Sequence, residues 1–243
     1  MELKTSYIRW YHNKLVAGLF VVILDRQGGD PFFLINIECL GAGRDDLAIS
    51  SCFIDYSNKL YRSGLGMNIL ILSGSPRKGG NTNLLVEAFV KGASPRHHVE
   101  VVSVHDYKIN PCIGCNSCFA REDHKCCQKD DMQIVYEKAA AAEILVIASP
   151  VYFYGLSAQL KAVIDRFHNP IRDTFHIHKM ALLLVGAASL PELFDGILAQ
   201  YRLCLNFFKL QDMGRVLVRG AKDKGDVGEI ALQQAYELGK MLE

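Results

Sequence analysis

Two hydrophobic periods alternate along the chain from residue 67 onward. Short runs of apolar residues, such as NILILS at 68–73, are typical of strands that are buried on both faces. Between these runs, apolar residues recur every three or four positions, which indicates amphipathic helices. The pattern predicts strands at 68–73, 99–104, 143–149, 180–186 and 215–220, and helices at 82–91, 131–142, 157–167, 191–208 and 227–241.

Five strands that alternate with five helices predict an α/β domain. Its sheet should be parallel and doubly wound, with helices on both faces, because each crossover is right-handed and places its helix on one face. In such sheets ligands bind beyond the carboxyl ends of the strands. Each candidate motif of this chain directly follows a strand, so we expect all of them at that edge.

Residues 1–66 do not share this rhythm. Three apolar segments, at 15–24, 31–40 and 47–54, are separated by RQGGD and GAGRDD, which are turn-forming sequences. They predict a small three-stranded meander, which is too small to be stable alone. We therefore expect two parts: an N-terminal β-rich extension with its linker at 1–66, and the α/β domain at 67–243.

The composition excludes some classes of protein. The chain has 27 Lys and Arg residues against 26 Asp and Glu, whereas proteins that bind nucleic acid carry clustered positive charge. Its longest apolar run, 15–24, is about half of the roughly 20 residues that a membrane-spanning helix needs. We expect neither a nucleic-acid partner nor a membrane span.

The segment SGSPRKGGNTN at 73–83 joins the first strand of the domain to its first helix. Its glycines allow tight turns, its hydroxyl and amide groups can bind an anion, and the helix N-terminus adds free N–H groups. The order of residues differs from both common nucleotide-binding loops, G-x-x-x-x-G-K-[ST] and G-x-G-x-x-G. The segment therefore predicts a phosphate cradle, although an ordinary capped turn would use the same residues.

Three motifs in order resemble the NAD(P)H-dependent FMN reductase family of flavodoxin-like proteins, and in particular its iron-sulfur flavoprotein branch. They are ILILSGSPRKGGNTNLL, INPCIGC and SPVYFYGLSAQLKAVIDRF, and the resemblance covers residues 67–243. It implies the strand order 2-1-3-4-5 and non-covalent FMN at the carboxyl end of the first strand. Around the flavin phosphate it implies Ser73, Ser75, Arg77, Asn81, Thr82 and Asn83.

The loop after the third strand can hold the flavin ring, because a proline, three aromatics and a glycine offer a flat wall and main-chain N–H groups. We expect Pro150, Val151, Tyr152, Phe153, Tyr154 and Gly155 there. The small residues Ala187 and Ser189, in the turn after the fourth strand, should line the other edge of the ring. Since the cofactor carries the chemistry, we expect no catalytic side chain.

Five of the eight cysteines fall within residues 112–127. The spacing C-x2-C-x2-C lets successive thiolates converge on one centre, and it favours a 4Fe-4S cluster over zinc or free thiols, which stay open. The resemblance implies Cys112, Cys115 and Cys118 as ligands, with Cys126 a better fourth than Cys127. Such a cluster of thiols indicates a reducing compartment, the cytoplasm.

The sequence thus predicts an FMN-dependent oxidoreductase or electron-transfer flavoprotein with an iron-sulfur cluster. It would move electrons between NAD(P)H or ferredoxin and a small acceptor such as a quinone or a flavin. The resemblance also implies a homodimer or homotetramer. Two alternatives remain: a cluster-free NAD(P)H-dependent FMN or quinone reductase, and a non-enzymatic redox or metal sensor.

Overall fold

The computed structural model describes residues 22–24, 32–34 and 66–242. The chain divides into two compact units, Met1–Lys59 and Leu60–Glu243. In the first unit, strands β1 (Val22–Leu24) and β2 (Phe32–Leu34) pair antiparallel. They fall in the first two segments of the expected meander, whereas the third segment and the linker lie outside the described residues.

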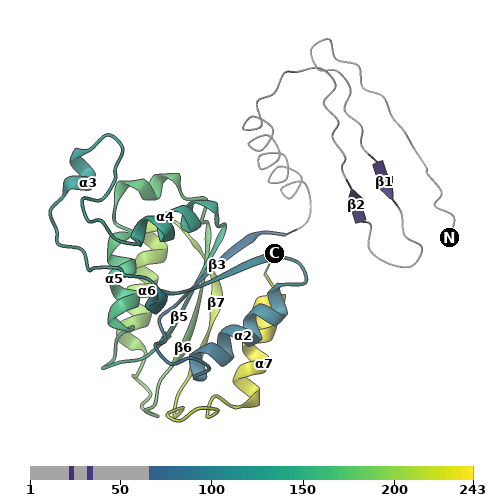
Figure 1. Cartoon of the computed structure of the whole chain (residues 1–243). Coiled ribbons are helices and arrows are strands. Elements are labelled where there is room, and N and C mark those ends of the chain that lie inside the picture. The colour runs from purple at the N-terminus through teal and green to yellow at the C-terminus, as the bar shows by residue number, and fades with distance from the viewer. Residues whose placement is uncertain (1–21, 25–31, 35–65, 243) are drawn as a thin grey trace. The chain divides into compact units, whose positions relative to one another are not determined.

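The second unit is built on a five-stranded parallel sheet (Figure 1). Its strands are β3 (Asn68–Ser73), β4 (His98–Ser103), β5 (Ile144–Pro150), β6 (Lys179–Val185) and β7 (Gln211–Val218). They are ordered β4-β3-β5-β6-β7, and every neighbouring pair is parallel. This is the predicted order 2-1-3-4-5, so the doubly wound fold is confirmed.

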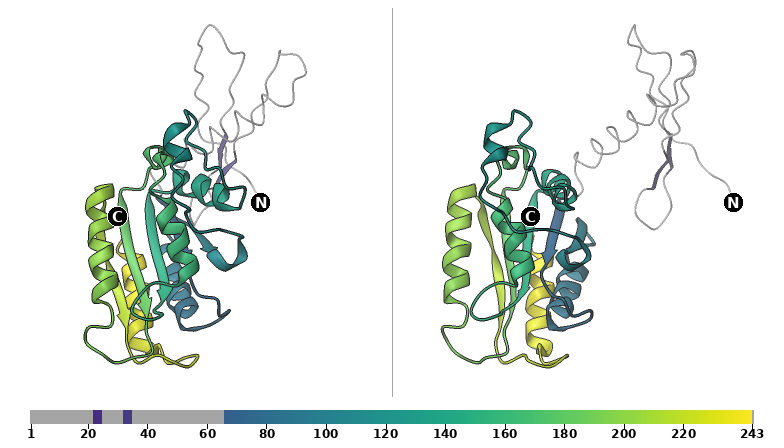
Figure 2. Two further views of the ribbon diagram at one scale, coloured as in Figure 1. Left: turned by 90° about the vertical axis from the view of Figure 1, so that its left-hand side faces the viewer. Right: turned by 60° about the vertical axis from the view of Figure 1, so that its left-hand side comes forward.

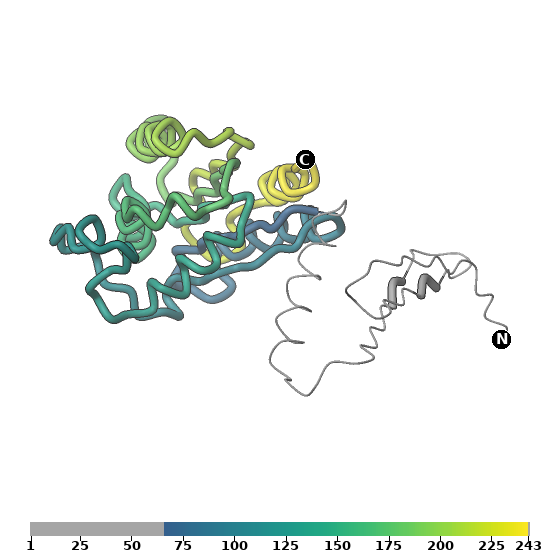
Figure 3. The backbone as a smooth tube through the Cα atoms, turned by 90° about the horizontal axis from the view of Figure 1, so that it is seen from above, coloured from purple at the N-terminus to yellow at the C-terminus, as the bar shows by residue number. Residues whose placement is uncertain are grey.

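Helices cover both faces of this sheet (Figures 2 and 3). One face carries α2 (Asn81–Ala93) and α7 (Gly228–Lys240), and the other carries α4 (Met132–Ala141), α5 (Ala158–Arg166) and α6 (Asp195–Phe208). Along β3, Ile69 and Ile71 pack with the first pair of helices, whereas Leu70 and Leu72 pack with the second group. Because alternate side chains of a strand point to opposite faces, this two-sided burial explains the unbroken apolar runs.

The observed elements differ from the expected ones mainly at two ends. The helix predicted from residue 191 begins only at Asp195, after a turn. The last strand begins at Gln211 instead of 215, and an irregular pairing with β6 near Gly214 accompanies its polar, exposed start. Short helical segments were not predicted: η1 (Val104–Asp106), α3 (Ser117–Ala120) and η2 (Pro170–Thr174). No helix in the described part of the chain is long and apolar enough to cross a membrane.

Candidate functional site

The loop between β3 and α2 is held tightly against its neighbours at its first residue. The N–H of Gly74 donates to the Ala148 carbonyl of β5 at 2.8 Å. A Cβ added to Gly74 would lie 2.8 Å from Leu160 Cβ and closer still to Ser157 Oγ. His105, which sequence reasoning missed, has its Nε2 atom 3.2 Å from the Gly74 carbonyl. Only glycine fits here, and the loop leaves the sheet in a fixed direction.

Beyond Gly74 the loop carries polar side chains that are largely buried. Ser75 Oγ accepts from the N–H of Arg77 at 3.3 Å, and Ser75 and Thr82 are only 9% and 2% exposed. Helix α2 has Gly80 as its N-cap, so within the described residues no side chain caps its first N–H groups. These donors and the positive end of the helix dipole suit a phosphate dianion. The residues present therefore fit the phosphate group of FMN.

Asn81 binds this loop to the distant loop after β7. Sequence reasoning missed this contact. Its Nδ2 atom donates to the Asp223 carbonyl at 2.7 Å, and its Oδ1 atom accepts from the N–H of Gly225 at 2.8 Å. Arg77 Nη1 also donates to the Lys222 carbonyl, at 3.4 Å. Both polar groups of the Asn81 side chain are thus bound to the loop after β7, and Asn81 shapes the cradle.

Asn83 lies in the first turn of α2, directly after Thr82. Its side chain lines a cavity of about 410 Å³ between α2 and β4, together with Ser73, Val86 and Ser103. Among the described residues, the buried Oδ1 atom of Asn83 has no hydrogen-bond partner. Two of the predicted phosphate residues, Ser73 and Asn83, therefore line one cavity, and their role as phosphate ligands stays a prediction.

The loop after β5 is a tight turn that presents aromatic side chains to solvent. Tyr152 and Gly155 exchange backbone hydrogen bonds at 3.0 and 3.1 Å. Phe153 and Tyr154 between them have φ values of 49° and 65°, a region that non-glycine residues seldom adopt. Their exposed fractions, 98% for Phe153 and 50% for Tyr154, show that these rings do not cap the core. The two rings contact each other edge to face, with centroids 5.8 Å apart and an interplanar angle of 66°, and they offer apolar surface to a ligand.

Backbone hydrogen bonds fix this loop to the end of β6 and hold the turn that follows β6, in which Ala187 and Ser189 lie. The N–H of Val151, next to Pro150, donates to the Val185 carbonyl at 2.7 Å. The N–H of Gly220 donates to the Ala188 carbonyl at 3.1 Å, which fixes the far side of the turn. The structure thus brings the phosphate cradle, the aromatic loop and this turn together at the carboxyl edge of the sheet.

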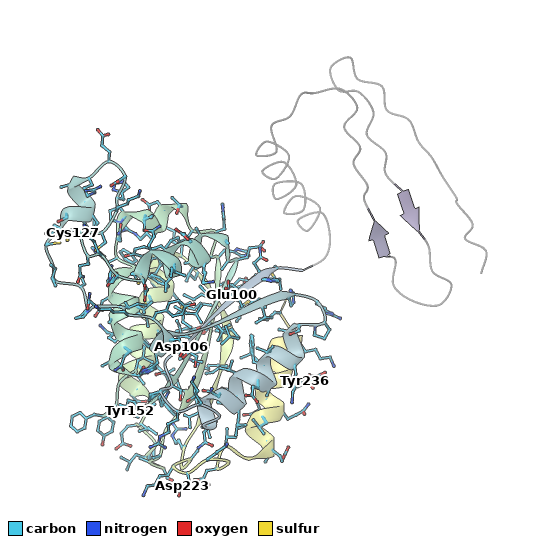
Figure 4. The ribbon with its side chains drawn as sticks, viewed as in Figure 1. Glu100, Asp106, Cys127, Tyr152, Asp223 and Tyr236 are labelled. Atoms are coloured by element: carbon cyan, nitrogen blue, oxygen red, sulfur yellow. The ribbon has the colours of Figure 1, made fainter. Side chains whose placement is uncertain are left out.

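The cysteine loop lies elsewhere, and here the expectation of one common edge was wrong. The chain leaves the carboxyl edge after η1 and reaches Arg166, in the last turn of α5, where Asp130 pairs with this arginine. Helix α5 begins just after the aromatic loop and spans roughly 13 Å at 1.5 Å per residue. Cys127 and Tyr152 accordingly lie toward opposite ends of the domain (Figure 4). The cysteine loop and the aromatic loop therefore lie near opposite ends of α5.

The two ends of the cysteine loop are clamped together by Asp130 and Asp131. Lys108 and Asp131 exchange hydrogen bonds at 2.7 and 3.0 Å. Asp130 Oδ2 accepts from the N–H of Asn110 at 2.9 Å and from Arg166 Nη1 at 2.5 Å. The Arg166 and Asp130 side chains are only 3% and 1% exposed. Sequence reasoning missed this ion pair, although an arginine on the apolar face of a predicted helix calls for a buried partner.

Two influences act on the carboxyl group of Asp130 in opposite directions. Burial by itself would raise the pKa of Asp130, but hydrogen bonds from Arg166 and Asn110 outweigh it, so that the pKa lies below its ordinary value. The carboxylate is therefore ionised, and the pair anchors the base of the cysteine loop to α5.

Inside this clamp, the cysteines lie on an exposed loop around Cys118. Burial raises the pKa of Cys118, and the neighbouring thiolates of Cys126, Cys112 and Cys115 raise it further. Hydrogen bonds from Ser117 lower the pKa of Cys115 to about 7. The thiolates have the right donor atoms for an iron-sulfur cluster. Within residues 66–242, however, no three His, Cys, Asp or Glu side chains converge as they would around a metal ion, so the loop would have to close around such a centre.

Cys127 stands close to one of these thiols. Its Sγ atom lies 3.5 Å from Cys115 Sγ, which is also 3.2 Å from Ser117 Oγ. Cys127 therefore lies nearer to Cys115 in the structure than their separation in the sequence suggests. The preference for Cys126 as the fourth ligand stays a prediction.

The sequence of the α/β domain matches known proteins. The sequence model of NADPH-dependent FMN reductases matches residues 67–223. An iron-sulfur flavoprotein of Archaeoglobus fulgidus is 37% identical over 181 residues, which cover 72% of this chain and 79% of that protein. An iron-sulfur flavoprotein of Methanocaldococcus jannaschii is 44% identical over 125 residues, or 50% of this chain, and the chain spans less than two thirds, 63%, of its length.

A solved structure is similar in fold. The NAD(P)H:quinone oxidoreductase of Methanothermobacter marburgensis superposes with a TM-score of 0.60 and 19% sequence identity, over 73% of this chain and all of the other. The parallel sheet and the family match over most of the α/β domain agree with one another. This chain therefore belongs to the NADPH-dependent FMN reductase family of flavodoxin-like oxidoreductases.

Proposed function

We propose that the chain binds one FMN at the carboxyl edge of β3, β5 and β6. The observation that carries the proposal is the uncapped N-terminus of α2, which adjoins the buried Ser75 and Thr82 in a loop shaped by Gly74. In this arrangement Ser75, Thr82 and the first N–H groups of α2 hold the phosphate. Arg77 and Asn81 fix the loop after β7 beside it.

The exposed aromatic loop would lie along the flavin ring. When bound, FMN supplies the capacity to accept hydride and to release one or two electrons. The protein's part is to bind and orient: Tyr152 and Tyr154 wall the ring, and Ala187 and Ser189 leave space along its other edge. The half-exposed position of these aromatics leaves one side of the site open to a second flat molecule.

We propose that this second molecule is NAD(P)H and that the electrons pass to a small acceptor such as a quinone or a free flavin. The name of the solved structure with a similar fold, an NAD(P)H:quinone oxidoreductase, supports this choice. Anaerobic stopped-flow mixing of the FMN-loaded protein with NADPH, NADH or reduced ferredoxin tests it. Bleaching of flavin absorbance by a nicotinamide supports an NAD(P)H-dependent enzyme, and bleaching by ferredoxin alone supports a carrier.

For the cysteine loop we propose a 4Fe-4S cluster held by Cys112, Cys115, Cys118 and Cys126. Support comes from the iron-sulfur flavoproteins among the relatives and from the position of all four cysteines on one loop, whose ends Asp130 and Asp131 clamp together. A Cys115→Ser variant should lose its iron and sulfide but keep FMN, because the two sites lie at opposite ends of α5. A variant with unchanged iron content would contradict the ligand assignment.

A cluster-free reductase is the second candidate, because the sulfur atoms of Cys115 and Cys127 already lie near each other as free thiols. Iron and sulfide analysis after anaerobic purification separates the two.

We further propose a homodimer or homotetramer in a reducing compartment, the cytoplasm. In such an assembly the cysteine loop of one copy approaches the flavin of another. Electrons then pass between the two copies and need not travel the length of α5. Light scattering measures the oligomeric state.

A further inference from the structure

The cysteine loop holds one thiol more than the proposed cluster needs. The fifth thiol, Cys127, lies 3.5 Å from Cys115, sulfur to sulfur, although twelve positions separate the two residues in the sequence. Both residues are exposed, so a small oxidant can reach them. Ser117 Oγ, at 3.2 Å from Cys115 Sγ, adds a polar group that can hydrogen-bond this sulfur atom.

We propose that Cys115 and Cys127 form a peroxide-reactive dithiol, which closes to a disulfide whenever the loop holds no metal centre. The Cys115 sulfur attacks one oxygen of a hydroperoxide, the O–O bond breaks, and water or an alcohol leaves, which gives a sulfenic acid. The Cys127 thiol then attacks that sulfur, the S–O bond breaks, and the thiol proton and the hydroxyl group leave as water while the S–S bond forms. Two thiols and one hydroperoxide thus give one disulfide, one molecule of water or alcohol from the first step and one of water from the second, and a dithiol reductant restores the thiols.

The geometry singles out this pair among the five thiols. Formation of the bond requires the sulfur atoms to approach from 3.5 Å to roughly 2.05 Å, a short movement for an exposed loop. The loop ends are clamped at Asp130 and Asp131, so the two segments that carry these thiols are already side by side. A disulfide between the adjacent residues Cys126 and Cys127 would instead strain the backbone that joins them.

The consequence is a choice between two states of the loop. The disulfide removes the Cys115 thiolate, so the oxidised loop cannot supply the four thiolates of the proposed cluster until it is reduced. The dithiol itself depends neither on FMN nor on the cluster proposal, since it requires only that the free thiols take the arrangement seen here.

Peptide mapping tests the proposal on the full chain. The protein is reduced, stripped of metal with a chelator, desalted anaerobically and treated with one equivalent of hydrogen peroxide. The remaining thiols are then alkylated before tryptic digestion, which separates peptide 109–121, with Cys115, from peptide 126–129, with Cys127. The expected product links these two peptides through Cys115 and Cys127, and titration should show a loss of about two thiols per chain.

Matched serine variants of adjacent residues locate the bond. Cys127→Ser should abolish the linked peptides, whereas Cys126→Ser should leave their yield within about twofold of that of the unchanged chain, because the Cys127 sulfur lies 3.5 Å from that of Cys115. The reverse result, a bond between chains, or sulfinic acid at Cys115 with no disulfide would each overturn the proposal. The far-UV circular dichroism spectrum of every sample shows whether a variant has folded, and the peptide map of the unchanged chain tests the proposal even if a variant has not.

Discussion

Arg166→Met should destabilise the α/β domain strongly, because it leaves the Asp130 carboxylate buried without its counter-ion. The Asp130 side chain is 1% exposed and would retain only backbone N–H partners, from Asn110 and Met132. Loss of one member of a buried ion pair costs about 3–5 kcal/mol. We take about 3 kcal/mol, because a loop base near the surface can relax toward water. For a domain of this size that lowers the melting temperature by about 6–12 °C.

Urea and thermal unfolding at several pH values measure this effect. In the unchanged chain the pKa of Asp130 is lowered, so its ion pair stabilises the fold above the ordinary carboxyl pKa and is lost as the pH falls through the lower, folded value. In the variant, burial is left as the main influence and raises the pKa of Asp130. The destabilisation should therefore be largest near pH 7 and shrink toward pH 4.

The control is Lys161→Met on the same helix, which removes an exposed ion pair with Asp165 and should cost no more than about 0.5 kcal/mol. Faster alkylation of the half-buried Cys118 in Arg166→Met would show that the base of the loop has opened. A loss below about 1 kcal/mol for Arg166→Met, or a loss that does not vary with pH, would refute the argument that a buried ion pair holds the loop to α5.

Two further substitutions test the binding of FMN, and a third tests the exposure of the aromatic loop. Gly74→Ala should weaken FMN binding at least tenfold in a fluorescence-quenching titration, since the new Cβ would collide with Ser157, and an unchanged affinity would contradict the tight fit of this loop. Asn81→Ala frees the loop after β7 and should raise the Kd for FMN about tenfold; an unchanged Kd would remove Asn81 from the cradle. Phe153→Ala, at a side chain 98% exposed, should change the free energy of unfolding by less than about 0.5 kcal/mol, and a larger loss would mean that the ring is covered.

The sheet could be predicted because its burial is encoded locally. Both faces of β3, β5 and β6 are covered, so these strands are unbroken apolar runs that local pattern alone reveals. The last strand was placed too late because it starts with exposed polar residues near Gly214, which carry no such signal. Its pairing with β6, and not its composition, makes that segment a strand.

The candidate site likewise has parts that local sequence predicts and parts that depend on contacts between distant segments. The phosphate cradle and the aromatic loop follow their strands directly, and the structure places both at the carboxyl edge, as expected. The cysteine loop also follows a strand, but its position depends on a pair between Asp130 and Arg166, which are 36 residues apart. Asn81 likewise bonds to residues more than 140 positions away. Such contacts between distant segments cannot be read from spacing within one motif.

The most direct test of the account is the flavin content of the full-length protein. The chain is purified anaerobically, incubated with excess FMN, freed of unbound flavin and denatured in acid, and the released flavin is then identified and quantified. We predict about one FMN per chain, with a yellow protein before denaturation. A colourless protein that retains no FMN would contradict the flavin site built here on Gly74, Ser75, Thr82 and the N-terminus of α2.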